Sequence, residues 1–343
     1  MKCVPAREAA GLVIAHDITE IVPGGIRRTA FRRGHTVRPE DVERLLRLGK
    51  ENLYIQDDDD ADDGVHEDDA ARRLAAAFAG PGLEYGEPVE GRINFRAARR
   101  GLFVVNRELL DRVNAVPDVV SATRHSLQAV GKGDLLAGTR VVPLTVPEGT
   151  VQAAEACCRQ AASPLLAVLP FKKHRVAAVV TGREVYEGRV ADGFIPVLKK
   201  KFRAWGSQVF RERIVPDEKE VTAGAVREAL EQGADMVCVT GGMSVDPDDR
   251  TPAALRDVCN EIVVRGVPVF PGSMFMLGYA ERVPVLGLPG CVMYRRGCVF
   301  DIVAPRLLAG LRVTAGDARG FAHGGLCLEC PECVYPACAF GKY

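Results

Sequence analysis

Several properties that would point to a particular class of protein are missing from this chain of 343 residues. Its 45 basic and 45 acidic residues cancel, so it lacks the strongly basic balance of a nucleic-acid binder. No apolar run approaches the length of a membrane span, and Arg7, Glu8 and Asp17 interrupt the amino-terminal region where a signal-peptide core would lie. We therefore expect a cytoplasmic protein with neither a nucleic-acid nor a membrane partner.

Common catalytic motifs are missing as well. The sequence contains no GxxxxGKS/T phosphate loop, no GxGxxG, no GxSxG nucleophile elbow and no HExxH. These absences argue against kinase-like, dehydrogenase and serine-hydrolase functions. What the chain does contain is 47% hydrophobic and 26% charged residues, a globular composition whose length suits two or three domains.

Changes in pattern divide the chain into five segments. The acidic run from Asp57 to Asp69 is typical of a solvated linker, with metal binding as the weaker alternative because the spacing of a calcium loop is absent. Pro164 and Pro170 suggest a hinge. The predicted segments are an amino-terminal segment with a helix at 39–49 (1–56), an acidic linker and helix (57–83), a β-rich domain and hinge (84–170), an α/β domain (172–312) and a cysteine-rich tail (313–343).

Strand and helix patterns alternate regularly in segment 172–312. Buried strands are predicted at 175–182, 208–215, 236–240 and 283–288, with helices between them. Such alternation predicts an α/β fold with a doubly wound, mostly parallel sheet, preceded by a smaller β-rich mixed region.

Polar or glycine-rich loops follow the strands of this domain. Glycine lets a backbone approach a ligand closely, and carboxylates from several loops can hold a divalent ion that neutralises phosphate charge. The loops are Thr181-Gly182-Arg183-Glu184, Pro216-Asp217-Glu218, Thr240 to Asp249, Pro271-Gly272-Ser273 and Leu288-Pro289-Gly290.

Some of these residues also have ordinary structural explanations. Asp217 is placed to cap the helix that follows it, and Thr251-Pro252 is a normal helix start. Asp246, Asp248 and Asp249 repel one another, which favours a ligand or metal over chance.

The loop motifs together resemble a known family. TGGMSVDPDDRTP resembles the TGG…DxTP loop of the molybdopterin-binding fold, shared by molybdopterin adenylyltransferases, molybdenum insertases and the competence-damage-inducible family. TGREV is similar to TGDEL, RIVPDE to IVxDD and GLPGCV to GLPGNP, in the same order. The resemblance covers Arg175 to about Leu311. More weakly, GHTVRPEDVERLLRLGKENLYI resembles a segment of molybdenum insertases that directly precedes this domain, but here it lies over a hundred residues earlier.

The resemblance implies a molybdenum-cofactor assembly protein, expected to be a transferase, that binds molybdopterin or its adenylate with Mg²⁺. It implies catalytic roles for Asp249, Asp217 and Glu184. It also implies contacts with molybdopterin, an ATP or AMP moiety or molybdate, other cofactor-assembly proteins or molybdoenzymes as partners, and a homo-oligomer. The expected substrate-binding residues are Thr181, Gly182, Thr240, Gly241, Gly242, Ser244, Asp248, Gly272, Ser273, Leu288, Pro289 and Gly290.

Two other functions stay open. DDRT resembles the DDxT of competence-damage-inducible proteins, which would imply nucleotide pyrophosphate hydrolysis. A non-catalytic carrier or sensor of the finished cofactor is the third alternative.

The sequence also departs from the molybdenum insertase pattern. The insertase DGYA and TGAxxP stretches have no counterpart in this chain, and Cys291 replaces the Asn of GLPGNP.

The tail carries a separate candidate site. Cys327, Cys330, Cys333 and Cys338 follow the spacing x2, x2, x4, close to the bacterial ferredoxin run, whose last gap is x3. Two CxxC steps bring thiolates within reach of one centre, so we predict zinc or an iron–sulfur cluster, with reactive or incidental thiols as the alternative. His323 is a possible further ligand.

Overall fold

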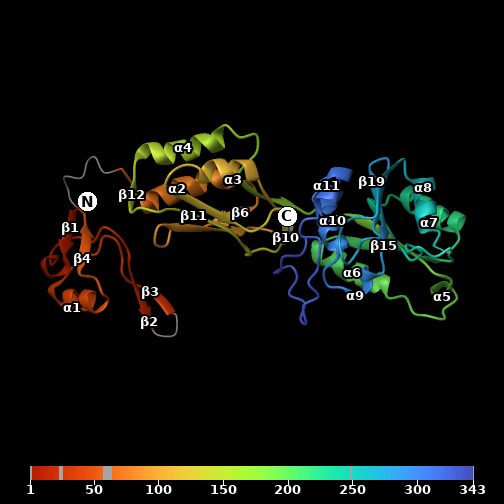
Figure 1. Cartoon of the computed structure of the whole chain (residues 1–343), viewed down its shortest axis with the longest axis horizontal. Helices are drawn as coiled ribbons and strands as arrows, with labels where there is room; N and C mark the ends of the chain where they lie inside the picture. Colours follow the sequence, from red (N-terminus) through yellow and green to blue (C-terminus); the bar gives the residue numbers. More distant parts are fainter. Residues whose placement is uncertain (1, 23–25, 57–63, 248, 343) are drawn as a thin grey trace. The chain divides into compact units, whose positions relative to one another are not determined.

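The computed structural model describes residues 2–22, 26–56, 64–247 and 249–342 of the chain (Figure 1). The chain forms two compact units. The first comprises Met1–Arg96, Asn106–Thr123 and Leu135–Leu166, and the second comprises Ala97–Val105, Arg124–Asp134 and Ala167–Tyr343. No helix in the described ranges has the length and apolar character needed to cross a membrane.

The amino-terminal part of the first unit has a small core of its own. Strands β1 (Lys2–Pro5) and β4 (Asn52–Ile55) pair antiparallel, as do β2 (Ile18–Val22) and β3 (Ile26–Phe31), and the short helix η1 (Ala6–Glu8) follows β1. Helix α1 (Pro39–Arg47) confirms the predicted helix, and Leu45 on it is fully buried among Ile14, Leu53 and Ile55.

The rest of the first unit is a four-stranded sheet in the order β6-β7-β11-β9, with helices on one side (Figure 1). A two-stranded pair, β5 and β12, adjoins it. The elements are β5 (Val65–His66), α2 (Glu67–Phe78), β6 (Leu83–Tyr85), β7 (Arg92–Ala97), α3 (Arg107–Asn114), β9 (Val119–Thr123), β11 (Leu135–Val141), β12 (Thr145–Val146) and α4 (Glu148–Arg159).

Helix α3 corrects the expectation of a region built of strands and turns. Its start is stabilised by Asn106, whose side-chain oxygen accepts a hydrogen bond from the backbone N–H of Leu109 at 3.0 Å. Leu109 and Val113, four positions apart, form its buried face. The acidic run was predicted over Asp57 to Asp69. Its first part, 57–63, lies outside the described residues, and Asp68 and Asp69 belong to α2.

The second unit contains the predicted doubly wound sheet. Its order is β15-β14-β16-β19-β18-β17, and the first four strands are parallel. Strand β18 runs antiparallel to β19, and β17 antiparallel to β18. The strands are β14 (Arg175–Thr181), β15 (Gln208–Val215), β16 (Met236–Thr240), β17 (Glu261–Arg265), β18 (Met276–Ala280) and β19 (Val283–Leu288). The predicted fold class is confirmed, while β17 and β18 add strands that the sequence analysis did not anticipate.

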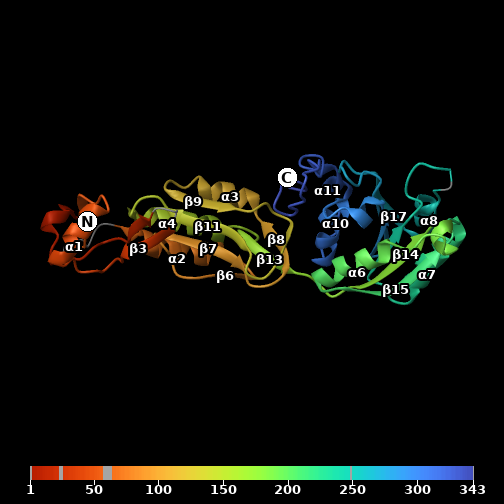
Figure 2. The same ribbon diagram turned by 90° about the horizontal axis from the view of Figure 1, so that it is seen from below.

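Helices cover both faces of this sheet. Alternate residues of β14 point to opposite faces, so Ala178 and Val180 enter one core and Ala177 and Val179 the other. Figure 1 and Figure 2 both show α7 and α8 on one side of the sheet and α10 on the other. The helices are α5 (Arg183–Tyr186), α6 (Phe194–Trp205), α7 (Lys219–Glu231), α8 (Thr251–Val258), α9 (Cys291–Tyr294), α10 (Val299–Leu308) and α11 (Ala315–Gly320).

The second unit also includes a three-stranded sheet in the order β10-β8-β13. Its strands are β8 (Gly101–Val105), β10 (Gln128–Val130) and β13 (Leu166–Pro170). The segment between Pro164 and Pro170, where a hinge was predicted, thus contains strand β13.

Candidate functional site

The carboxyl ends of the parallel strands bring most predicted site residues to one edge of the sheet. The strand register places Val180 beside Thr240, and Thr240 beside Leu288. Strand β15 ends level with Thr181, because Thr181 pairs with Val215. Open α/β sheets bind ligands at this edge, which makes it the candidate site.

Asp217 is the centre of the polar contacts at this edge. The hydroxyl of Thr181 donates to Asp217 Oδ1 at 2.9 Å, and the backbone N–H of Arg183 donates to Asp217 Oδ2 at 2.9 Å. The carboxylate therefore links the end of β14 to the start of α5. The prediction that Asp217 caps α7 is wrong, because the residue before that helix is Glu218 and it makes no capping bond through its side chain.

Two glycines let the loop after β16 press against this cluster. Gly241 has φ of +87°, and a Cβ there would lie 2.0 Å from the carbonyl oxygen of Thr181. Gly242 has φ of +54°, and a Cβ there would lie 2.9 Å from Thr251 Oγ1 and 3.5 Å from Asp217 Oδ1. Only glycine combines this backbone conformation with the close approach, so the TGG motif is needed for the shape of the edge.

Thr251 joins the same loop to helix α8. Its hydroxyl donates to the carbonyl oxygen of Gly241 at 2.9 Å and lies 3.4 Å from the Thr181 hydroxyl. The sequence predicted Thr251 as an ordinary helix cap, whereas α8 begins at Thr251 and the residue before it is Arg250. Its position after TGG in the motif was the available signal for its role at the edge.

The acidic part of the loop closes on itself. Asp249 Oδ2 accepts the backbone N–H of Asp246 at 3.1 Å, and the N–H of Asp249 donates to the carbonyl oxygen of Asp246 at 3.0 Å. Ser244 is exposed at the tip of the loop. Asp248 lies outside the described residues. Asp246 and Asp249 are thus held together by a backbone turn, which needs no metal.

Glu184 lies on α5 and is exposed. Across the described ranges, no group of three or more His, Cys, Asp or Glu side chains is close enough to hold one metal ion. The structure therefore does not gather Glu184, Asp217 and Asp249 into a three-carboxylate centre. It leaves Asp217 as the carboxylate that joins its own loop to the loop after β14.

Thr240 lies fully buried at the end of β16. Its hydroxyl has no hydrogen-bond partner in the structure. Because a buried hydroxyl without a partner costs free energy, its presence at the edge favours a ligand-related role.

The remaining predicted substrate-binding residues lie on the half of the edge formed by β18 and β19. Gly272 and Ser273 belong to the connection between β17 and β18, and a Cβ at Gly272 would lie 2.4 Å from Val299 Cγ1. Leu288 ends β19, and Pro289 and Gly290 lead into α9.

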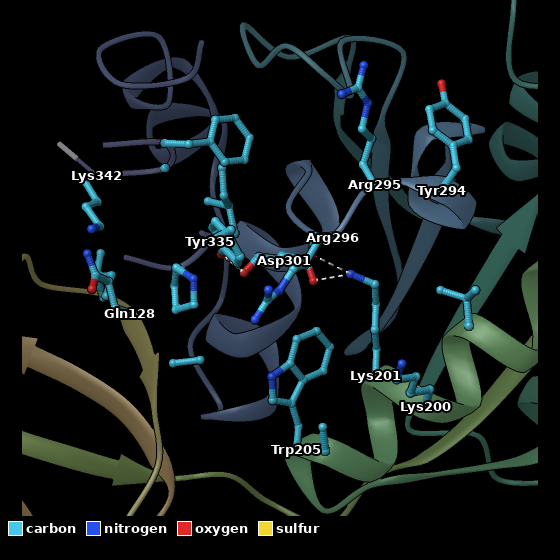
Figure 3. A pocket seen from close by; sticks show the side chains of 18 of the residues that line it. Gln128, Lys200, Lys201, Trp205, Tyr294, Arg295, Arg296, Asp301, Tyr335 and Lys342 are labelled. Carbon is cyan, nitrogen blue, oxygen red and sulfur yellow. Dashed lines mark hydrogen bonds and ion pairs between the residues drawn. The ribbon is translucent and has the colours of Figure 1, made fainter. Parts of the chain in front are cut away.

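The second unit also contains a cavity of about 820 Å³ (Figure 3). None of the predicted site residues lines it. Lys201 from α6 and Asp301 from α10 point toward each other in its wall and form an ion pair. Burial raises the pKa of Asp301, and Lys201 opposes that rise. Aromatic side chains of Trp205 and Tyr335 also line the cavity.

Cys291, which stands in place of the family's Asn, is buried beside Cys298. A hydrogen bond between the two thiols lowers the pKa of Cys291 and raises the pKa of Cys298. The Cys298 thiol also contacts Asp301 Oδ2 at 3.3 Å. These groups form a structural cluster at the start of α10.

The four tail cysteines share the lining of one cavity of about 310 Å³. All four are free thiols. Within the part of the chain that the structure describes, no three of these thiols are close enough together to bind one metal ion. His323 lies in the turn after α11, and it does not line this cavity.

Comparison with known proteins identifies the domain that carries this edge. Residues 177–309 match a family described as "Probable molybdopterin binding domain", which confirms the resemblance predicted from the loop motifs. Residues 3–57 match a family described as "Domain of unknown function (DUF8806)".

Individual relatives match over the same part of the chain. A molybdopterin molybdenumtransferase of Staphylococcus epidermidis is 29% identical over 126 residues, covering 35% of this chain and 30% of the relative. A putative molybdopterin biosynthesis protein of Methanocaldococcus jannaschii is 36% identical over 77 residues, covering 22% of this chain and 19% of the relative. The chain thus spans about 30% of the length of the first of these relatives.

Solved structures with similar parts include two molybdopterin biosynthesis proteins. The MoaB enzyme of Thermus thermophilus is 24% identical, covering 40% of this chain and 97% of its own, with a TM-score of 0.35. The Mog protein of Mycobacterium ulcerans is 20% identical, covering 39% of this chain and 92% of its own, with a TM-score of 0.33.

Proposed function

We propose that the second unit binds molybdopterin or its adenylate at the carboxyl edge of the six-stranded sheet and acts as a transferase in molybdenum cofactor assembly. The observation that carries the proposal is the cluster of Thr181, Asp217, Gly241 and Thr251, whose hydrogen bonds and close approach join three loops. The family match at 177–309 supports the choice of ligand.

Each residue of the edge has a role in this proposal. Gly241 and Gly242 let the loop after β16 press against Thr181 and Thr251 and so shape the edge. Thr240 and Ser244 would supply hydroxyls to the ligand, and Gly182 would lie beside it. The other half of the edge, formed by Gly272, Ser273 and the Leu288-Pro289-Gly290 turn, would bind the remainder of a ligand as long as an adenylated pterin.

Asp217 fits a magnesium ion that is held mainly by substrate phosphates. Magnesium in proteins commonly uses one or two carboxylates together with phosphate oxygens and water. Asp217 would supply one carboxylate, with Asp249 or Glu184 as the second when the ligand is bound. The ion would neutralise phosphate charge. Asp217 itself orients the Thr181 hydroxyl and the N–H of Arg183.

The experiment is to purify the full chain anaerobically and measure its affinity for molybdopterin and its turnover of adenylated molybdopterin, with and without Mg²⁺. We expect binding in both conditions and AMP release only with Mg²⁺. Binding without any turnover would support the carrier alternative. AMP release from ADP-ribose or a pyridine dinucleotide, without binding of molybdopterin, would support the competence-damage-inducible type of hydrolase.

The cysteine tail is proposed as a separate metal-binding module, holding zinc or an iron–sulfur cluster through Cys327, Cys330, Cys333 and Cys338. A homo-oligomer, cofactor-assembly proteins or molybdoenzymes as partners, and a cytoplasmic location stay predictions. Gel filtration with light scattering tests the first of these.

A further inference from the structure

The cysteine-rich segment is a loop that the protein closes at its base. Past α11, residues 321–342 contain no helix or strand. The N–H of Cys327 donates to the carbonyl oxygen of Phe270 at 2.8 Å, and the N–H of Phe270 donates to Gly325 at 2.8 Å. At the other end, the N–H of Gly341 donates to the carbonyl oxygen of Gly324 at 2.9 Å. The loop between these bonds is therefore fixed at its ends and has no regular structure inside.

The cysteines of this loop surround a volume instead of meeting at a point. All four line the cavity of about 310 Å³, yet no three of the described donors are close enough to share one ion. A structural zinc ion holds its four ligands around a single centre, with sulfurs at about 2.3 Å from it. In a four-iron, four-sulfide cluster each thiolate binds a different iron at the periphery, so the sulfurs lie farther apart. The arrangement fits the cluster better than the single ion.

The wall of the cavity matches the charge of such a cluster. Arg295 and Arg296 both line it, and Arg296 donates to the carbonyl oxygen of Cys333 at 3.1 Å. Arg295 is paired with Glu329, which lines the same cavity, at 2.7 Å, so Arg296 carries the unbalanced positive charge of the wall. A four-iron, four-sulfide cluster with four thiolates carries a net negative charge when half of its iron is ferric, so a nearby guanidinium group stabilises it.

Aromatic side chains form one side of the same wall. Phe340 is buried in the main core of the second unit, and Tyr335 packs against it with ring centroids 6.0 Å apart. Tyr335 also donates to the carbonyl oxygen of Asp301 at 3.3 Å. One side of the cavity is thus a fixed part of the α/β domain, and the thiols come from the loop.

From these observations we infer that the tail holds a four-iron, four-sulfide cluster bound by Cys327, Cys330, Cys333 and Cys338, and that zinc is not its native metal. This inference selects between the two centres proposed above for the tail. It does not rest on the molybdopterin proposal, because its measurements concern the metal alone. Assembly takes up two ferrous ions, two ferric ions and four sulfides and releases the thiol protons, so no further oxidant is needed.

The experiment is anaerobic reconstitution of the full chain with equal ferrous and ferric iron and sulfide, followed by desalting. Iron and acid-labile sulfide are then measured, together with the visible absorption band and the electron paramagnetic resonance signal after reduction. We expect about four iron and four sulfide per chain. Two iron per chain, or no retained iron together with one tightly bound zinc, would overturn the inference.

Matched cysteine variants show which thiols are used. Cys330→Ser changes an exposed loop thiol, and Cys3→Ser changes an exposed thiol of the first unit. We expect Cys330→Ser to retain roughly tenfold less iron than the wild type, and Cys3→Ser to retain as much. Equal retention by the two variants would contradict the assignment. Thermal unfolding of both variants is measured first, and because both thiols are exposed we expect unchanged transitions.

Discussion

The Asp217 cluster and the cysteine loop differ in what holds their side chains in place. Around Asp217, protein groups hold one another: the Thr181 hydroxyl, the Arg183 N–H and the Thr251 hydroxyl all have partners. In the cysteine loop, the backbone is fixed at its base and by Arg296 at the carbonyl oxygen of Cys333, whereas the four thiols line a cavity without converging on one ion.

This difference indicates two ways of making a binding site. The Asp217 edge is organised before its ligand arrives, so a substrate that must enter and leave meets donors and acceptors already in position. The thiols of the cysteine loop are not gathered in this way, which suits a centre that stays bound and orders its own ligands. If the two regions differ in this way, a change in one should leave the other intact.

The largest effect is expected from Gly241→Ala. The new methyl group would lie 2.0 Å from the carbonyl oxygen of Thr181, in a backbone conformation with φ of +87°. Strain and overpacking should lower the free energy of unfolding by about 2–5 kcal/mol.

The control is Gly224→Ala on α7, where a Cβ meets nothing within 4 Å. Chemical denaturation should show the control stabilised by up to about 1 kcal/mol. Equal stability of the two variants would mean that the loop adjusts freely.

The next effect concerns Asp217. Asp217→Asn removes the charge but keeps one acceptor oxygen, so we expect molybdopterin affinity in Mg²⁺ to fall roughly tenfold, or about 1.4 kcal/mol. Addition of Mg²⁺ should no longer strengthen binding.

Asp235→Asn is the matched control for this variant. Asp235 also accepts a backbone N–H through its carboxylate, from Arg175 at 2.8 Å, but at the amino end of β14. Titration calorimetry should show wild-type affinity for this control. Equal losses in both variants would assign the effect to stability instead of to the site.

Removal of the metal tests the independence of the two regions. Chelation should speed proteolytic cleavage within 325–341 roughly tenfold, because the loop loses the centre that orders it. The affinity for molybdopterin should change less than about twofold, since the Asp217 cluster makes its hydrogen bonds without the tail. A parallel loss of affinity would show that the regions are coupled.

The smallest effect is expected from Thr240→Val. The Thr240 hydroxyl is buried without a partner, so its replacement should leave stability unchanged or raise it by up to about 1 kcal/mol. Affinity for molybdopterin should fall a few-fold if the hydroxyl contacts the ligand.

Thr139→Val provides the comparison for a buried threonine with partners. Thr139 is 1% exposed, and its hydroxyl bonds Ser121 at 2.8 Å and the carbonyl oxygen of Val120 at 3.2 Å. Its replacement should cost about 1–2 kcal/mol in thermal unfolding. A similar cost at Thr240 would reveal a partner within the protein.

Local patterns were sufficient to predict much of the sheet domain. Strands β14, β16 and β19 are largely apolar and are followed by glycine or proline, whereas β15 carries several charged residues. Helix α6 ends at Gly206 with φ of +85°, a common helix end. The antiparallel strands β17 and β18 were missed because their short apolar runs carry no signal that distinguishes them from loop or helix.

Residue roles at the edge depended on contacts between distant parts of the chain. Asp217 has the sequence signature of a helix cap, yet its partners come from the neighbouring strand end, 34 and 36 positions away. The Thr251 hydroxyl likewise lies 3.4 Å from the Thr181 hydroxyl, 70 positions away. Such contacts follow from strand order and register, which a single sequence does not specify residue by residue.

Hydrogen–deuterium exchange of the full chain, with and without molybdopterin, tests the central claim most directly. The account predicts slower exchange on binding in 181–186, 216–220 and 240–247, and unchanged exchange in 325–341. Protection confined to 325–341, or to the cavity lined by Lys201 and Tyr335, would contradict it.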